Sequence, residues 1–279
     1  MLVRGGQVGR LVAGGTGEVP KGGRRGQVRE WSRASRRRAL RTVLACEWPA
    51  DLVHVTLTYP AAERPMDGRV SAGHLLAFRH RWRRRFGADP VGLWKREFQA
   101  NGSVHYHLWL VRPGLPFDDP GSLSLGVATW QTPEGSSLAV STSDLRAWVA
   151  EAWAGVVKAK SLAHRKAGTK VAPWEGSPGA YIAAYTVSKS AKEYQHKLPA
   201  GFVHPGRWWG LWGIAPRWEE IEITREEFFA IRRRMVRLLK SRGIKYKRRG
   251  VNGMWVSSAS TAELFRDYLV EWRKEGRTE

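Results

Sequence analysis

The chain has 279 residues, and its 47 Lys and Arg against 25 Asp and Glu give a formal net charge of +22. This excess predicts a polyanionic partner, with nucleic acid first and an anionic membrane surface second. The single cysteine, Cys46, excludes an internal disulfide and a cysteine-rich zinc site, and it favours the cytoplasm. The sequence shows no apolar run long enough to cross a bilayer and no signal peptide, so we expect no membrane insertion.

Apolar periodicity and turn residues predict the elements in chain order. Residues 1–28 are rich in Gly and Arg and are expected to form a flexible basic arm. Helices are predicted over 29–48, 71–86, from a cap at Ser143, and over 179–195, 225–242 and 260–274; strands are predicted over 52–59, 94–99, 104–111, 170–174 and 222–223. Residues 124–131 are either a strand or a loop, and 158–170 and 199–218 are expected to be loops. This order predicts an α+β fold, in which helices flank an antiparallel central sheet and a basic helical extension follows at the C-terminus.

The two strands over 94–99 and 104–111 form a predicted hairpin, because Asn101-Gly102 between them is a strong turn signal. Side chains alternate along a strand, so His105 and His107 share one face of the sheet. Across the turn, Glu97 is expected to lie near one of these two histidines. Two imidazoles and a carboxylate suit a divalent metal, with Glu97 as the third ligand.

The helix predicted over 179–195 carries Tyr181 and Tyr185 one turn apart on one face. Ser188, Lys189 and Lys192 fall on the same side. A tyrosine can act as a covalent nucleophile, but its ordinary pKa near ~10 leaves little phenolate at neutral pH. A nearby divalent metal and lysine ammonium groups reduce that cost and offset charge on a phosphate.

These residues resemble the HUH endonucleases and, more narrowly, the rolling-circle replication initiators of bacterial plasmids and phages. The resemblance covers residues 50–215 and rests on motifs in the family's order. These are Val55-Thr-Leu-Thr-Tyr-Pro60, His105-Tyr-His107, Tyr181-Ile-Ala-Ala-Tyr185, the spacing of Glu97 from His105, and Gly206-Arg-Trp-Trp-Gly210. Relatives often have a lysine where this chain has Ala184.

The resemblance implies a ferredoxin- or RRM-like core within a nicking domain over residues 29–224, between the arm at 1–28 and a helical region at 225–279. It implies metal-dependent nicking and joining of single-stranded or hairpin origin DNA. His105, His107 and Glu97 would hold Mg²⁺ or Mn²⁺. Tyr185 or Tyr181 would attack phosphorus, giving a 5′-phosphotyrosine and a free 3′-OH. Tyr185 is favoured because Lys189 and Lys192 follow it on its own face. A host helicase and polymerase would be required.

Two other functions fit the same sequence. One is a transposase or relaxase built on the same core, and the other is a non-catalytic binder of single-stranded nucleic acid. Simpler interpretations also exist for the motifs: the tyrosines could be interfacial aromatics, and Glu97 could pair with Arg96 or Arg84. The basic helix over 71–86 is either a solvated face or a phosphate-contacting surface. The residues predicted to contact nucleic acid are Arg81, Arg83, Arg84, Arg85 and Lys192.

Overall fold

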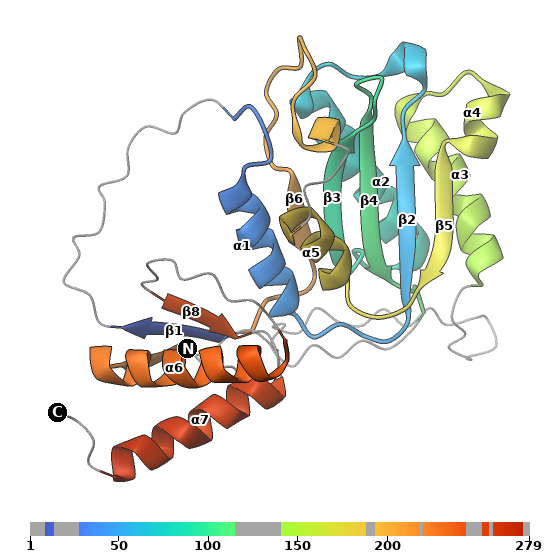
Figure 1. Ribbon diagram of the computed structural model, residues 1–279. Helices are drawn as coiled ribbons and strands as arrows, with labels where there is room; N and C mark the ends of the chain where they lie inside the picture. The colour runs from blue at the N-terminus through green and yellow to red at the C-terminus, as the bar shows by residue number, and fades with distance from the viewer. Residues whose placement is uncertain are drawn as a thin grey trace. The chain divides into compact units, whose positions relative to one another are not determined.

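The computed structural model describes residues 9–13, 28–114, 141–187, 193–217, 220–243, 253–256 and 259–275. The chain divides into two compact units (Figure 1). The larger unit comprises residues 26–40 and 48–215, and the smaller unit comprises residues 1–25, 41–47 and 216–279. The C-terminal part of the smaller unit therefore starts at residue 216, whereas the sequence placed the start of the C-terminal region at residue 225.

A five-stranded antiparallel sheet forms the centre of the larger unit, with the strand order β5-β2-β4-β3-β6 (Figure 1). Its strands are β2 (Leu52–Thr58), β3 (Gly92–Phe98), β4 (Val104–Val111), β5 (Thr169–Trp174) and β6 (Trp209–Trp212). Every neighbouring pair runs antiparallel. The predicted α+β fold with an antiparallel sheet and flanking helices is confirmed.

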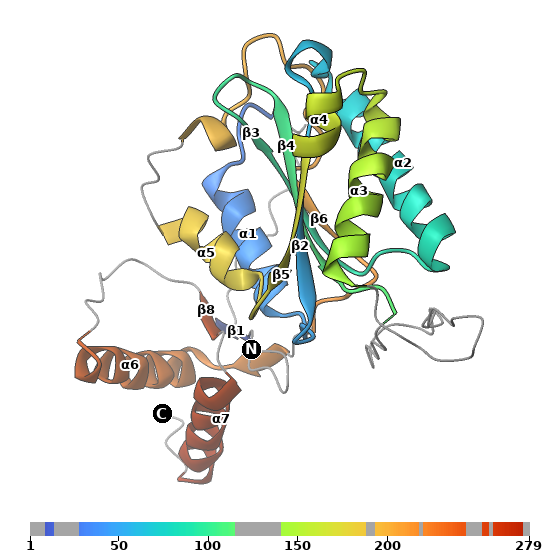
Figure 2. The ribbon, with the colours of Figure 1, turned by 90° about the vertical axis from the view of Figure 1, so that its right-hand side faces the viewer.

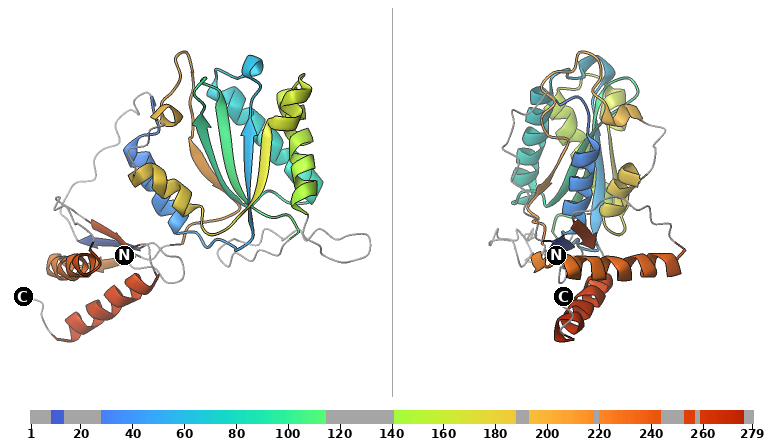
Figure 3. Two further views of the ribbon diagram at one scale, coloured as in Figure 1. Left: turned by 45° about the vertical axis from the view of Figure 1, so that its right-hand side comes forward. Right: turned by 60° about the vertical axis from the view of Figure 1, so that its left-hand side comes forward.

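Helices cover both faces of this sheet (Figures 2 and 3). Helices α2 (Gly68–Phe86) and α3 (Thr142–Val157) lie on one face, and α5 (Gly179–Val187) and the beginning of α1 (Arg33–Leu44) lie on the other. Aromatic rings pack the α2–α3 layer; they belong to Phe78, Trp82, Phe86, Trp148 and Trp153. Several tryptophans of this unusually Trp-rich chain are therefore core residues.

Local side-chain contacts define the ends of the helices in that layer. The Asp67 carboxylate accepts a hydrogen bond from the Arg69 amide at 2.7 Å, so α2 begins before Ser71. Gly87 ends the helix with φ 80°, a left-handed conformation that favours glycine. The N-cap of α3 is Ser141, whose hydroxyl accepts from the Asp144 amide at 3.1 Å, and not the predicted Ser143.

Three further segments differ from the prediction. The sequence predicts a loop over 158–170, but Leu162–Ala167 form helix α4, with Ser161 as its N-cap. The sequence also predicts a loop over 199–218, but part of this segment is strand β6, which pairs with β3. Helix α5 ends at Val187 among the described residues, and a 3-10 turn, η2, covers Glu193–His196. A second 3-10 turn, η1, covers Ala61–Glu63. Residues 124–131 lie outside the described ranges.

The smaller unit is a three-stranded sheet with two helices. Strand β1 (Gly9–Ala13) lies between β7 (Glu220–Ile223) and β8 (Gly253–Val256), parallel to β7 and antiparallel to β8. Helices α6 (Arg225–Ser241) and α7 (Ala259–Lys274) pack with β7 around one apolar cluster. The residues of this cluster are Ile223, Phe228, Ile231, Phe265 and Leu269. Part of the predicted flexible arm is therefore a strand.

Glu227 links the two helices of the smaller unit. Its carboxylate closes a capping box with Thr224, accepting from the Thr224 amide at 2.7 Å, and it accepts from Arg273 Nε at 2.6 Å. Burial would raise the pKa of Glu227, but the Arg273 hydrogen bond and the Thr224 amide lower it. Because the folded pKa is lowered, this stabilisation is present at neutral pH and is lost as the carboxylate is protonated in acid.

We expect Glu227→Ala to lower the free energy of unfolding of the smaller unit by about 1–2 kcal/mol at pH 7. The substitution removes the cap and leaves the Arg273 guanidinium, which is half exposed, without this partner. Urea unfolding followed by circular dichroism measures the effect. Glu226→Ala is the matched control, since Glu226 is an exposed acidic residue of the same helical turn. Equal stability of the two variants would contradict the assignment.

Candidate functional site

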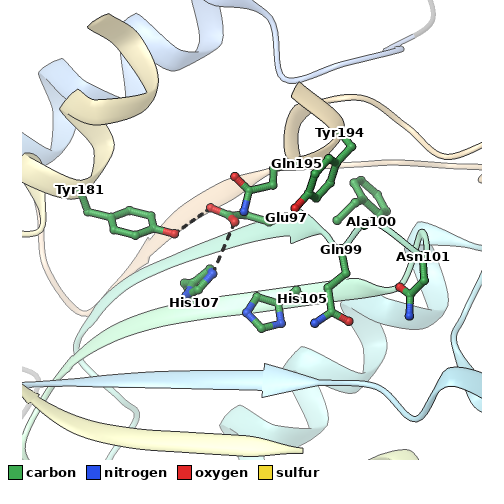
Figure 4. A pocket seen from close by; sticks show the side chains of 10 residues that line it. Glu97, Gln99, Ala100, Asn101, His105, His107, Tyr181, Tyr194 and Gln195 are labelled. Carbon is green, nitrogen blue, oxygen red and sulfur yellow. Dashed lines mark hydrogen bonds and ion pairs between the residues drawn. The ribbon is translucent and has the colours of Figure 1, made fainter. Parts of the chain in front are cut away.

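Four side chains from three elements meet on the sheet face that α5 covers. Glu97 comes from β3, His105 and His107 come from β4, and Tyr181 comes from α5. The register pairs Glu97 with His105 and Lys95 with His107, so one side of the hairpin carries these two pairs, and Tyr181 approaches from α5. Figure 4 shows the Tyr181 ring pointing from α5 toward the Glu97 carboxylate. The sequence predicted the hairpin, the shared face of the histidines and the proximity of Glu97.

A pocket of about 710 Å³ opens over these residues. Its wall includes the hairpin turn and the 3-10 segment η2 as well as the cluster. The lining residues are Glu97, Phe98, Gln99, Ala100, Asn101, His105, His107, Tyr181, Tyr194 and Gln195 (Figure 4). The titratable groups therefore face a space large enough for part of a nucleotide chain, and amide side chains and a second tyrosine surround them.

Glu97 is the centre of the cluster, with only 1% of its surface exposed. Its Oε1 accepts hydrogen bonds from the Tyr181 hydroxyl, at 3.0 Å, and from the Lys95 ammonium. Its Oε2 lies 3.5 Å from His107 Nε2 and accepts no hydrogen bond from any described residue. One oxygen of a buried carboxylate is thus left for a further partner.

Residues of strand β2 contact the Nδ1 atoms of both imidazoles. His107 Nδ1 lies 3.0 Å from His54 Nε2, and the two rings stack with an interplanar angle of 6°. His105 Nδ1 lies 3.1 Å from Thr58 Oγ1. With Nδ1 as the donor to Thr58 Oγ1, His105 keeps a lone pair at Nε2. His107 Nε2 faces the Glu97 carboxylate, and a proton on that nitrogen stabilises the ionised form of Glu97.

Burial sets the charge states in the cluster. It lowers the pKa of His105 to about 4, with a further contribution from His107, and it lowers the pKa of His54 to about 4 in the same way. Burial would raise the pKa of Glu97, but the contact with His107 and the Lys95 charge outweigh it and hold that pKa well below its usual range. At neutral pH the site therefore presents neutral imidazoles at these two positions and an ionised carboxylate.

These donors fit the divalent metal that the family resemblance implies. Neutral imidazole nitrogens and a carboxylate are ordinary ligands of Mn²⁺ and related ions, and Glu97 Oε2 is a buried oxygen without a hydrogen bond. Within the described ranges, however, no three His, Cys, Asp or Glu side chains already stand as a complete ligand set. At this site the Lys95 ammonium donates to Glu97 Oε1, while Oε2 stays without a hydrogen bond from any described residue.

Tyr181 is held by rings as well as by its hydroxyl. Its ring centroid lies 4.6 Å from that of Trp109 and 5.5 Å from that of His107. Tyr185 follows one turn later in α5, but its side chain is not described, and Lys189 and Lys192 lie outside the described residues. The predicted preference for Tyr185 therefore has no structural test, whereas Tyr181 is in direct contact with Glu97.

The predicted arginines do not join the cluster. Arg81, Arg83, Arg84 and Arg85 belong to α2, which lies on the opposite face of the sheet (Figure 2). The sequence also offered Arg96 or Arg84 as ion-pair partners of Glu97, but the structure pairs Glu97 with Lys95. Arg96 points to the other face and donates to the Pro205 carbonyl oxygen. Contact of α2 with nucleic acid stays a prediction for a surface separate from this pocket.

Sequence reasoning missed Lys95 and Thr58 as members of the site. The signal was present: Lys95 is two residues before Glu97, and residues at this spacing share a face. His54 and Thr58 alternate in the same way along β2. Their cross-strand partners depend on the pairing of β2 with β4, which the sequence did not specify. Tyr194 and Gln195 were missed because they follow the end of α5.

No protein-family model, curated protein or solved structure matches this chain. In the part of the chain that the structure describes, none of the helices combines the length and apolar character needed to cross a membrane. The functional assignment therefore rests on the residues of the pocket and on their geometry.

Proposed function

We propose that this chain nicks and rejoins single-stranded DNA through a covalent tyrosine linkage and so initiates rolling-circle replication of a plasmid or phage. The contact of the Tyr181 hydroxyl with Glu97, beside His105 and His107, carries this proposal. It brings a nucleophile of the required type to a carboxylate–imidazole cluster inside one pocket. The net charge of +22 supports a polyanionic substrate.

The cluster would hold Mg²⁺ or Mn²⁺ through His105, His107 and Glu97. When bound, such an ion supplies a Lewis acid for the non-bridging oxygens of the scissile phosphate. The two imidazoles favour Mn²⁺ over Mg²⁺. His54 and Thr58 contact the two imidazoles at their Nδ1 atoms, so the Nε2 atoms would be the metal ligands.

Tyr181 is the proposed nucleophile. Glu97 orients its hydroxyl through the 3.0 Å hydrogen bond, and Trp109 and His107 fix its ring. The Tyr181 oxygen forms a bond to phosphorus, and the bond from phosphorus to the 3′-oxygen breaks. Tyr181 releases one proton and the leaving oxygen takes one, which gives a 5′-phosphotyrosine and a 3′-OH. The phosphodiester energy is kept in the new linkage, so rejoining needs no ATP.

The proposed partners follow from this reaction. The substrate is single-stranded or hairpin DNA at an origin, and the free 3′-OH is a primer for a host polymerase. The sequence contains no Gly-x-x-x-x-Gly-Lys-Ser/Thr loop, so a host helicase would open the duplex. We propose the cytoplasm as the site of action. A transposase or relaxase would use the same linkage, whereas a non-catalytic binder would form none.

We expect the purified chain to form a covalent adduct with DNA in the presence of Mn²⁺ and none in EDTA. The test uses circular single-stranded DNA of mixed sequence, denaturing electrophoresis to detect the adduct, and mass spectrometry of the linked peptide. Adduct on a peptide that contains Tyr181 supports the proposal. Binding of the DNA without any adduct in Mn²⁺ or Mg²⁺ favours the non-catalytic binder, and an adduct of equal yield in EDTA contradicts the metal.

A further inference from the structure

Lys95 is a fully buried charged residue in the centre of the candidate site. Its side chain is 0% exposed, and its ammonium donates to Glu97 Oε1, the same oxygen that accepts from the Tyr181 hydroxyl. Its Nζ lies 4.7 Å from the centroid of the Trp31 ring and 5.3 Å from that of Tyr181. A carboxylate and two aromatic faces therefore surround one positive charge.

We propose that Lys95 is an internal cation that competes with the divalent metal for the Glu97 carboxylate and thereby sets the metal affinity of the site. This inference rests on the proposed function, because it takes His105, His107 and Glu97 as the metal ligands. It assigns to Lys95 a role distinct from ligation or nucleophilic attack. Lys95 is a positioning residue that acts through Glu97.

The electrostatics of a buried site give the direction of the effect. An ammonium and a divalent cation repel each other, and burial weakens the screening that water provides at the surface. The ammonium and the metal ion would share the Glu97 carboxylate. Lys95 donates to its Oε1, and its Oε2 accepts no hydrogen bond from any described residue. Metal binding must therefore overcome either the Lys95–Glu97 pair or the repulsion from a charge that stays nearby.

The same pair explains how the site keeps its shape without a metal. An unpaired buried carboxylate is costly, and Lys95 offsets that cost through the ion pair. Tyr181 is then held on the same oxygen, close to the histidines. The described part of α5 contains no Lys or Arg, so this helix adds no charge of its own beside Tyr181. The cation next to the tyrosine comes from β3 instead.

The test is Mn²⁺ binding by the full chain without DNA, followed by the electron paramagnetic resonance signal of free Mn²⁺. We expect Lys95→Gln to bind Mn²⁺ at least about tenfold more tightly than the unchanged chain, because it keeps a donor for Glu97 and removes the charge. Lys95→Met is the second variant, with an apolar side chain of similar length between the two rings. Circular dichroism and thermal melting establish that each variant is folded.

Lys166→Gln is the matched control, since it removes the same charge from an exposed position in helix α4. We expect its Mn²⁺ affinity to stay within about twofold of that of the unchanged chain. Adding His105→Ala to Lys95→Gln should abolish the gain, which assigns it to this site. Folded Lys95→Gln and Lys95→Met proteins that bind Mn²⁺ no more tightly than the unchanged chain would overturn the inference.

The failure of this inference can be told apart from the failure of the proposed function. If the unchanged chain binds Mn²⁺ in a way that requires His105 and Glu97, and neither Lys95 variant binds more tightly, the metal site stands and the role of Lys95 is wrong. If no protein in the series shows binding that depends on His105, the metal site itself is wrong and the Lys95 inference falls with it.

Discussion

Tyr181→Phe should lower the rate of covalent adduct formation by at least about 10³-fold, the scale expected when a nucleophile is removed. The substitution deletes only the hydroxyl that donates to Glu97. The ring contacts with Trp109 and His107 stay available, so the fold and the pocket should be preserved. Single-turnover formation of the adduct on denaturing gels, with Mn²⁺ and excess protein, measures this rate.

Tyr185→Phe is the control for this experiment, because Tyr185 is the other tyrosine of the same helix. We expect it to keep at least about a tenth of the adduct rate if Tyr181 alone makes the first attack. Mn²⁺ binding by Tyr181→Phe should match that of the unchanged chain, which separates loss of the nucleophile from loss of the site. An adduct mapped to Tyr185 in the unchanged chain would reverse the assignment. Continued nicking by the double Phe variant would exclude a tyrosine mechanism altogether.

The hairpin that carries the site was predictable because its determinants are local. Asn101 accepts a hydrogen bond from the Ser103 amide at 2.9 Å, and Gly102 takes a positive φ of 79°, as the turn residues indicated. Alternation along β4 then places His105 and His107 on one face. The carboxylate could also be placed, since the turn fixes the register that pairs Glu97 with His105.

The remaining parts depend on pairings between distant segments. Strand β6 reads as a loop because Gly210 interrupts it, yet a Cβ at that position would lie 2.7 Å from Trp94 Nε1, so close packing against β3 requires the glycine. Strand β1 has the composition of a flexible arm, and it becomes a strand by pairing with β7 and β8, which are more than 200 residues away. Local propensity gives no signal for such contacts.

The basic partner of Glu97 was also not predicted from the sequence. Arg96 is the adjacent basic residue in sequence, but alternation sends its side chain to the opposite face, where it donates to the Pro205 carbonyl oxygen. Lys95, two residues before Glu97, is on the correct face. Period-two alternation alone would have selected it. The cation next to Tyr181 was instead sought at Lys189 and Lys192, because they follow the tyrosines in sequence.

Thr58→Val should weaken Mn²⁺ binding by about 10- to 100-fold, the range expected when a hydrogen-bond partner behind a metal ligand is removed. Thr58 Oγ1 lies 3.1 Å from His105 Nδ1, and valine has nearly the same shape without an acceptor. The His105 ring then loses the contact that favours a proton on Nδ1 and a lone pair on Nε2. Mn²⁺ titration of the full chain, followed by electron paramagnetic resonance, measures the affinity.

Thr56→Val is the matched control, because Thr56 precedes Thr58 by two residues and lies on the same face of β2. Its cross-strand partner is His107, whose Nδ1 contacts His54 instead. We expect Thr56→Val to change Mn²⁺ affinity by less than about threefold. His54→Phe should resemble Thr58→Val, since it keeps an aromatic ring against His107 and removes the nitrogen. Equal affinities for the Thr56 and Thr58 variants would show that β2 packs against the histidines without orienting them.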